Sequence, residues 1–168
     1  MRLINEISKK EFILIFKNIF EKCDWIAEEL YNFKPFNDFN ELENKIYEIF
    51  NRLNDKKKLE IIINHPDLAD KAKIRTLTLD SFNEQSNSEL DQCSENEFNE
   101  FQNLNKTYKK KFGFPFIFAV SGKKKKEILT NFKKRIYSQR NNEFKEAIKQ
   151  VKKIAKFRLS KIKVNMKL

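Results

Sequence analysis

Hydrophobic residues recur at helical spacing along most of this chain. In the segment SKKEFILIFKNIF, Ser8 and Glu11 form a capping box that is followed by five apolar positions on one helix face. A helix that ends before Pro35 follows, and Pro66 ends a later one, because the residue before a proline disfavours the α conformation. The helices predicted for the first half lie within the segments 8–20, 24–34, 39–53 and 55–65.

The second half continues the helical pattern after an interruption. Leu77, Leu79 and Phe82 are interpreted as part of a connecting stretch. A second capping box, SENEF, begins a long helix that is expected to end at Phe112, and Gly113 suits the position after its last turn. The segment FPFIFAV is apolar on both sides and predicts a buried extended segment near 114–120. Two further helices are expected near 123–140 and 141–163.

These elements predict an all-α fold, a single-domain helical bundle over residues 1–168. A chain of 168 residues suits one domain, and its 17 phenylalanines can fill a core although 35% of the residues are charged. Only 2 glycines and 3 prolines argue against an all-β protein, which needs many turns. No internal repeat or linker interrupts the pattern.

The cysteines and the apolar segments indicate the compartment in which the protein is expected. Cys23 and Cys93 are far apart in the sequence and form no CxxC pair, and the charged start MRLINEISKKEF is unlike a signal peptide. The longest apolar run, FPFIFAV, is far too short to cross a membrane. We therefore expect a soluble, cytoplasmic protein without a membrane partner.

The net charge of +11 raises the question of nucleic acid binding. The lysines are scattered through runs such as KKKLE, KKKK and KKRI, on what are predicted to be solvent faces of helices. No zinc-finger, helix-turn-helix or RNP motif occurs. Specific binding of nucleic acid is therefore not expected, although a basic surface attracts anionic ligands by long-range steering.

A few polar residues stand where the helical pattern places apolar ones. In the last helix, Arg158 falls within a stripe of Val151, Ile154, Ala155, Leu159 and Ile162. A buried guanidinium needs an anion, either an internal carboxylate or a ligand, and the sequence favours neither. Asn105 and Tyr108 lie on the apolar face of the preceding long helix and are interpreted as structural.

His65 is the single histidine of the chain and ends a predicted helix. Free carbonyl groups and the helix dipole favour a charged imidazole there, which suits either a helix cap or a proton donor. Asp67 and Glu84 are candidate carboxylate partners, although Ser81 and Glu84 also fit another capping box. One histidine and two separated cysteines provide no cluster of metal ligands.

Together these motifs resemble the OHCU decarboxylase family. The resemblance rests on the order and spacing of HPDLA, LTLDSFNEQS, ELDQCSENEFNEFQNLNKTYKKKFGFPFIFAVSGKKKKEIL and RNNEFKEAIKQVKKIAKFRL, and it covers nearly the whole chain. It implies an all-α enzyme that converts 2-oxo-4-hydroxy-4-carboxy-5-ureidoimidazoline, or OHCU, to (S)-allantoin in urate degradation. It also implies a chain that is often dimeric, has no metal or organic cofactor, and is functionally linked to uricase and hydroxyisourate hydrolase.

The resemblance also assigns the site residues. It implies that His65 is the catalytic proton donor and that Glu84 pairs with it. The residues expected to bind the substrate are Pro66, Ser81, Gln85, Phe116, Ile117, Phe118, Ala119, Val120 and Arg158. Decarboxylation leaves an electron pair that the imidazoline ring can delocalise, so the protein must mainly orient the ring, stabilise an oxyanion and deliver a proton to one face.

The chain departs from the family pattern at three places. Ser121 stands where a basic residue is common, Asp70 replaces the usual glycine after HPDLA, and SNSEL replaces a glycine-rich stretch near residues 86–89. These changes are expected to affect substrate affinity more than the type of reaction. The alternative function is a non-catalytic basic helical scaffold that binds an anionic partner or nucleic acid.

Overall fold

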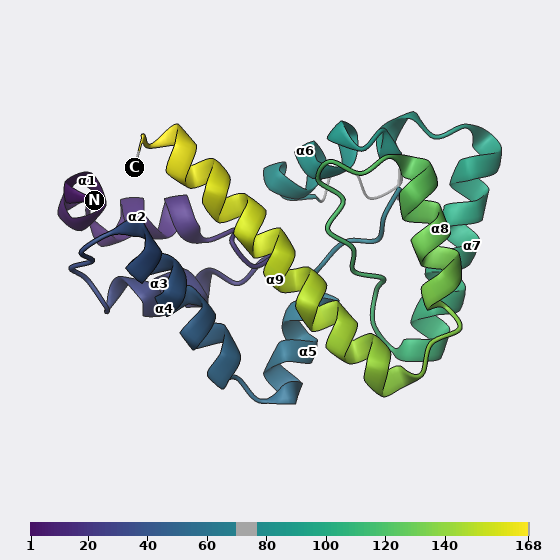
Figure 1. Ribbon diagram of the computed structural model, residues 1–168, viewed down its shortest axis with the longest axis horizontal. Coiled ribbons are helices and arrows are strands. Elements are labelled where there is room, and N and C mark those ends of the chain that lie inside the picture. The colour runs from purple at the N-terminus through teal and green to yellow at the C-terminus, as the bar shows by residue number, and fades with distance from the viewer. Residues whose placement is uncertain (70–76, 168) are drawn as a thin grey trace. The chain divides into compact units, whose positions relative to one another are not determined.

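The computed structural model of the protein describes residues 1–69 and 77–167 (Figure 1). Every regular element within these residues is helical, which confirms the predicted all-α class. In chain order the elements are α1 (Arg2–Glu6), α2 (Lys9–Phe16), α3 (Asp24–Tyr31), α4 (Phe39–Arg52), α5 (Asp55–Ile63), α6 (Leu79–Asn87), the 3-10 helix η2 (Leu90–Gln92), α7 (Glu95–Phe112), α8 (Lys125–Arg135) and α9 (Arg140–Asn165).

The chain divides into two compact units. The first comprises Met1–Ile61 and Ile154–Leu168, and the second comprises Ile62–Lys153. Helix α9 therefore contributes its first part to the second unit and its last part to the first unit. The single domain over residues 1–168 stays a prediction.

The core of the first unit is built around phenylalanine side chains of α2 and α4. Helix α2 begins with the predicted capping box, in which the Ser8 hydroxyl accepts from the backbone N–H of Glu11 and the Glu11 carboxylate accepts from that of Ser8. The rings of Phe12 and Phe16 lie 4.6 Å apart between centroids. Leu42, Ile46, Ile49 and Phe50 of α4 are buried, as the pattern predicted.

A buried ion pair lies within this first unit. Arg158 of α9 and Glu21, which follows α2, are 3% and 0% exposed, and Arg158 Nη1 lies 3.1 Å from the Glu21 Oε2 atom. The same nitrogen donates a 2.6 Å hydrogen bond to the Asn18 carbonyl oxygen. In the predicted apolar stripe, Val151, Ile154, Ala155 and Leu159 are buried and Ile162 is half-buried. An internal carboxylate neutralises the Arg158 guanidinium.

The second unit contains α6, α7, α8 and the first part of α9. Helices α7 and α8 lie side by side and run in the same direction, because the segment after α7 returns to the other end before α8 begins (Figure 1). Side-chain contacts agree with this arrangement. Lys125 Nζ, at the start of α8, lies 2.8 Å from Glu97 Oε2 near the start of α7. At the other end, Lys111 Nζ donates a 2.8 Å hydrogen bond to the Ile136 carbonyl.

The returning segment forms part of the core. Residues 114–120 adopt neither helix nor strand, and all except Phe118 are buried, as predicted for FPFIFAV. The ring of Phe116 stacks on Phe132 of α8 at 3.9 Å between centroids, and Tyr108 of α7 packs edge-on against both rings. Gly113, with a φ of 81°, ends α7 where the sequence predicted, in a conformation that favours glycine.

Three expectations about helices were wrong in detail. Helix α2 ends at Phe16, so Ile19 and Phe20, although buried, do not lie on it. Helix α8 ends at Arg135 and not near residue 140. The Ile136 carbonyl accepts from Lys111, and α9 begins after a short turn. The stretch around Leu79 and Phe82 is not a connection but part of α6, a helix whose buried face is polar.

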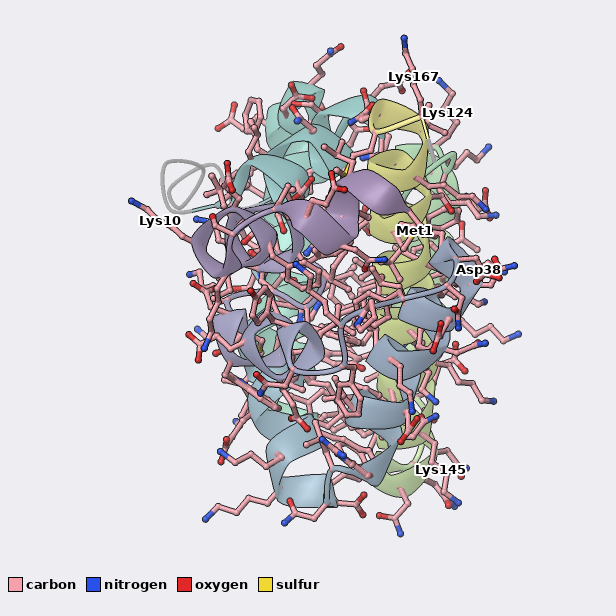
Figure 2. The ribbon with its side chains drawn as sticks, turned by 90° about the vertical axis from the view of Figure 1, so that its left-hand side faces the viewer. Met1, Lys10, Asp38, Lys124, Lys145 and Lys167 are labelled. Carbon is pink, nitrogen blue, oxygen red and sulfur yellow. The ribbon has the colours of Figure 1, made fainter. Side chains whose placement is uncertain are left out.

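The lysines lie largely on the surface. Lys10, Lys124, Lys145 and Lys167 are exposed and point away from the ribbon (Figure 2). This agrees with the prediction that the positive charge is distributed over solvent faces. Among residues 1–69 and 77–167, no helix combines the length and apolar character that crossing a membrane requires.

The Arg158–Glu21 pair predicts a specific stability pattern. Arg158→Met should lower the free energy of unfolding by about 3–5 kcal/mol, because it leaves the buried Glu21 carboxylate without its cation. The double variant Arg158→Met/Glu21→Leu should recover most of that loss, since no buried charge remains. Urea denaturation of the three proteins measures this. Arg140→Met, at an exposed position of the same helix, is the control and should change the stability by about 0.5 kcal/mol or less. A double variant no more stable than Arg158→Met would contradict the assignment of the pair.

Candidate active site

His65 lies in the loop that follows α5. Helix α5 ends at Ile63, and the backbone N–H of His65 donates to the Ile62 carbonyl at 3.2 Å. The prediction that this helix ends before Pro66 is therefore confirmed. The His65 side chain is buried, with 7% of its residue surface exposed. At a helix C-terminus the helix dipole favours a charged imidazole, whereas burial favours a neutral one.

Ser81, Glu84 and Gln85 lie on one buried face of α6. They are 4%, 8% and 8% exposed, and Ser88 directly after the helix is fully buried. Because residues three and four positions apart share a helix face, the motif S-x-x-E-Q places all three side chains together. The helix is capped by Thr78, whose hydroxyl accepts from the backbone N–H of Ser81.

This geometry corrects two interpretations of the sequence. The segment that contains Leu79 and Phe82 is helical, and Ser81 is not the N-cap of a helix but lies inside one. The polarity of α6 is inverted relative to an ordinary amphipathic helix, because its buried face is polar while Leu79 and Phe82 are 72% and 39% exposed. A search for buried apolar stripes therefore misses it.

Gln85 holds the loop that carries His65. Its Oε1 atom accepts a 2.9 Å hydrogen bond from the backbone N–H of Ala69, and its Nε2 atom donates to the Asp67 carbonyl at 3.3 Å. Ala69 has a φ of 54°, in the left-handed region that a residue with a side chain rarely adopts. The two bonds to Gln85 help to maintain that conformation.

Helix α7 holds the same loop through three side chains. Asn105 Nδ2 donates a 2.9 Å hydrogen bond to the Leu68 carbonyl, and Gln102 Nε2 donates to the Ala69 carbonyl at 3.3 Å. Lys109 Nζ lies 2.6 Å from Asp67 Oδ2. Asp67, a candidate partner of His65 in the sequence, is thus engaged by a lysine of α7.

The segment 116–120 is held in a similar way. Ser88 Oγ donates a 2.7 Å hydrogen bond to the Val120 carbonyl, and the Ala119 N–H donates to Gln150 Oε1 of α9 at 3.0 Å. Arg135 Nη1 donates to the Ile117 carbonyl at 2.7 Å. Because Gln85 lies in the last turn of α6 and Ser88 directly follows that helix, this short stretch contacts both the His65 loop and the segment 116–120.

Arg135 belongs to a buried network behind that segment. Its guanidinium pairs with the Glu143 carboxylate of α9 and lies 4.5 Å from the centroid of the Phe116 ring. The Tyr108 hydroxyl donates to the same Glu143 oxygen. Burial, and then the bond to Glu143, raise the pKa of Tyr108 well above its usual range, so the phenol remains a neutral donor.

Sequence reasoning missed Arg135, Glu143 and Gln150. Glu143 and Gln150 lie seven residues apart on α9 and are 1% and 5% exposed. The helical spacing that singled out Arg158 also places these two residues on a buried face. Arg135 carries no such signal, because it ends the basic run KKRI.

No cluster of metal ligands was found near these elements. Within the two described ranges, 1–69 and 77–167, no group of three or more His, Cys, Asp or Glu side chains could hold a metal ion.

Comparison with known proteins decides the family. Residues 5–160 match the family model described as OHCU decarboxylase. The matched residues include most of both units. The chain belongs to the OHCU decarboxylase family. The family predicted from the motifs is therefore confirmed.

Individual OHCU decarboxylase relatives support this placement. The chain is 34% identical to the 2-oxo-4-hydroxy-4-carboxy-5-ureidoimidazoline decarboxylase of Xenopus laevis over 100% of this chain and 97% of that protein. It is 38% identical, over 96% of its length, to the "Uric acid degradation bifunctional protein" of Bacillus sp. (strain TB-90), of which it spans only 32%. A crystal structure of OHCU decarboxylase in the presence of (S)-allantoin matches with a TM-score of 0.70 and 25% identity, over 93% of this chain and 98% of that one.

Two departures from the OHCU decarboxylase pattern now have a structural setting. In the SNSEL stretch, Glu89 adopts a left-handed conformation with a φ of 62°, which a glycine would adopt without strain. Its carboxylate lies 2.7 Å from Lys124 Nζ. Ser121 is half-buried, next to the anchored Val120. The third departure, Asp70, lies outside the described residues.

The network behind Phe116 predicts graded losses of stability. Arg135→Met should lower the free energy of unfolding by about 3–5 kcal/mol, because the buried Glu143 loses its cation. Tyr108→Phe should cost less, about 1.5–3 kcal/mol, because it removes one hydrogen bond to a charged group and leaves the ion pair intact. Thermal and urea denaturation test this order, with the exposed neighbour Lys134→Met as the control. A loss for Arg135→Met that is no larger than for Lys134→Met would contradict the role of the network.

Proposed function

We propose that this chain is a carboxy-lyase that decarboxylates OHCU to (S)-allantoin in urate degradation. The observation that carries the proposal is its membership of the OHCU decarboxylase family over residues 5–160. The full-length match to the Xenopus laevis decarboxylase supports the reaction. The matching crystal structure of OHCU decarboxylase was obtained in the presence of (S)-allantoin, which supports the product. The name of the Bacillus relative supports a place in the breakdown of uric acid.

The proposed reaction needs a proton and a place for an electron pair. The bond between the ring carbon and the carboxylate breaks, carbon dioxide leaves, and the electron pair passes into the conjugated ring as an enolate. One proton then adds to the neighbouring ring carbon, which carries the ureido group, while the carbon that lost carbon dioxide keeps its oxygen as a carbonyl. The face to which the proton adds determines the configuration of allantoin. The protein must therefore hold the ring in one orientation and provide the proton from one side.

His65 is the proposed proton donor and Glu84 its proposed orienting carboxylate. Both residues belong to the second unit and are buried, with 7% and 8% of their surfaces exposed. A charged imidazole is favoured at the end of α5 by the helix dipole. A carboxylate that accepts a hydrogen bond from the imidazole would favour the charged form further. Pro66, Ser81 and Gln85 are proposed to contact the ring and ureido groups.

The backbone of residues 116–120 is proposed to bind the polar edge of the substrate. The contacts of Ser88, Arg135 and Gln150 occupy two of its carbonyl groups and one N–H. Among the described residues, no hydrogen bond was found for the N–H groups of Ile117, Phe118 and Val120. Ile117 and Val120 are buried and Phe118 is half-buried. Buried N–H groups are nearly always hydrogen bonded, so these groups are proposed as donors to substrate or enolate oxygens.

A coupled assay from urate tests the proposal. Uricase and hydroxyisourate hydrolase generate OHCU in place, and circular dichroism follows the formation of optically active allantoin. The wild-type chain should form (S)-allantoin rapidly. His65→Asn should be slower by a factor of about 10²–10⁴, the usual contribution of a general acid. Lys110→Met, at an exposed position, is the control. Slow, racemic product with the wild-type chain would contradict the proposed function, and unchanged rate and stereochemistry in His65→Asn would contradict the role of His65.

The substrate contact of Arg158 stays a prediction, and the double variant Arg158→Met/Glu21→Leu tests it. If the role of Arg158 is purely structural, the Glu21 carboxylate, 3.1 Å away, is the anion that its guanidinium needs. If Arg158 also binds the substrate, the stable double variant should still lack activity. A return to the wild-type rate would contradict the substrate contact. The predicted homodimer and cytoplasmic location likewise stay predictions.

A further inference from the structure

We propose that Asn105, supported by Lys109, is a positioning residue that fixes the loop carrying His65. This inference rests on the proposed function for its catalytic consequence, but its structural part can be measured without the reaction. The sequence pattern had suggested only a structural role for Asn105. The contacts of α7 with the loop suggest a more specific one.

The loop has no regular secondary structure to hold it. From His65 to Ala69 the chain forms neither helix nor strand, and Ala69 has a left-handed backbone conformation. Contacts from side chains hold this segment in place of the backbone hydrogen bonds of a helix or strand. Asn105 binds the Leu68 carbonyl, Gln102 binds the Ala69 carbonyl, and Lys109 pairs with the Asp67 side chain. These anchors lie between two and four residues after His65.

Asn105 and Lys109 are one turn apart on α7. Residues at i and i+4 lie on the same face of a helix, so a single rigid helix determines the position of two successive loop residues, Asp67 and Leu68. Proton delivery to one face of a substrate requires a donor that is held within a fraction of an ångström. An anchored loop meets that requirement, whereas a loop with several conformations does not.

The Asn105 amide uses one of its two polar atoms to hold the loop. Its Nδ2 atom donates to Leu68, and this bond settles the orientation of the amide. The Oδ1 atom is then buried, and no partner for it was found among the described residues. An unsatisfied buried acceptor lowers stability. Leucine has a similar shape without that acceptor, but it would also remove the donor to the Leu68 carbonyl. What asparagine provides here is therefore its bond to the loop.

The first experiment observes His65 directly. Because the chain has one histidine, protein labelled with ¹⁵N-histidine gives one set of imidazole signals, and all of them belong to His65. Asn105→Leu should shift or broaden these signals while the fold, followed by circular dichroism, persists. Asn103→Leu is the matched control, since it is the same substitution at an exposed position of the same helix, and it should leave the imidazole signals unchanged.

The second experiment measures the catalytic consequence. In the coupled assay, Asn105→Leu should reduce the rate constant for (S)-allantoin formation by a factor of about 10², the scale expected for a displacement of about 1 Å. The KM should change by less than the rate constant. When enough enzyme is present for the catalysed reaction to outpace the spontaneous one, the enantiomeric excess of the product should also be lower than with the wild-type chain. A side chain that only stabilises the fold would change neither the imidazole signals nor the stereochemistry of a folded protein.

If Asn105→Leu does not fold, two milder variants at Lys109 test the positioning role. Lys109 is partly exposed, with 41% of its side-chain surface accessible, so its replacement should not prevent folding. Lys109→Met should shift the His65 signals, and Lys109→Arg, which keeps the cation, should restore them. Lys110→Met, at the exposed neighbouring position, is the control.

The outcomes separate this inference from the proposed function. Wild-type imidazole signals and rates in both Asn105→Leu and Lys109→Met would overturn the positioning role, whatever the reaction. Shifted signals in the variants, together with a wild-type chain that forms no (S)-allantoin, would support the positioning role and contradict the proposed function.

Discussion

The polar, buried face of α6 is the constraint on which the candidate site depends. Gln85 bonds to both sides of Leu68 in the His65 loop, and Ser88 bonds to Val120. Two segments without regular secondary structure are thereby tied to one short helix. Because an unpaired buried amide or hydroxyl is costly, these contacts restrict each segment to conformations that satisfy its partner. The same helix carries Ser81 and Glu84 on the same buried face.

Ionic and amide groups elsewhere in the second unit serve the same purpose. Arg135 connects the Ile117 carbonyl to the buried Glu143 carboxylate, and Gln150 binds the Ala119 N–H. Buried charges contribute little net stability when they are paired, but removing one partner is costly. Such groups therefore define a conformation more than they add to the free energy of folding. This is the expected arrangement for a protein that must hold irregular backbone in a fixed position.

The sequence predicted the regular parts of this fold well. The capping boxes at Ser8 and Ser94 and the helix end at Gly113 are local signals, and the structure agrees with each of them. Helix α6 was missed because its buried face is polar, which reverses the rule used to find helices. The motif resemblance nevertheless selected Ser81, Glu84 and Gln85 of this helix, and all three are buried. Their role in the site stays a prediction. The contacts of Asn105, Gln102 and Arg135 with backbone carbonyls depend on tertiary proximity, which periodicity does not reveal.

Amide hydrogen exchange of the wild-type protein tests the central claim, that side chains fix the two irregular segments. The N–H groups of Ala69 and Ala119 lie outside regular secondary structure and are held by Gln85 and Gln150, respectively. Both should exchange slowly, with protection close to that of Tyr108 in the buried part of α7. Exchange as rapid as that of the exposed Gly122 would show that side chains do not hold these segments.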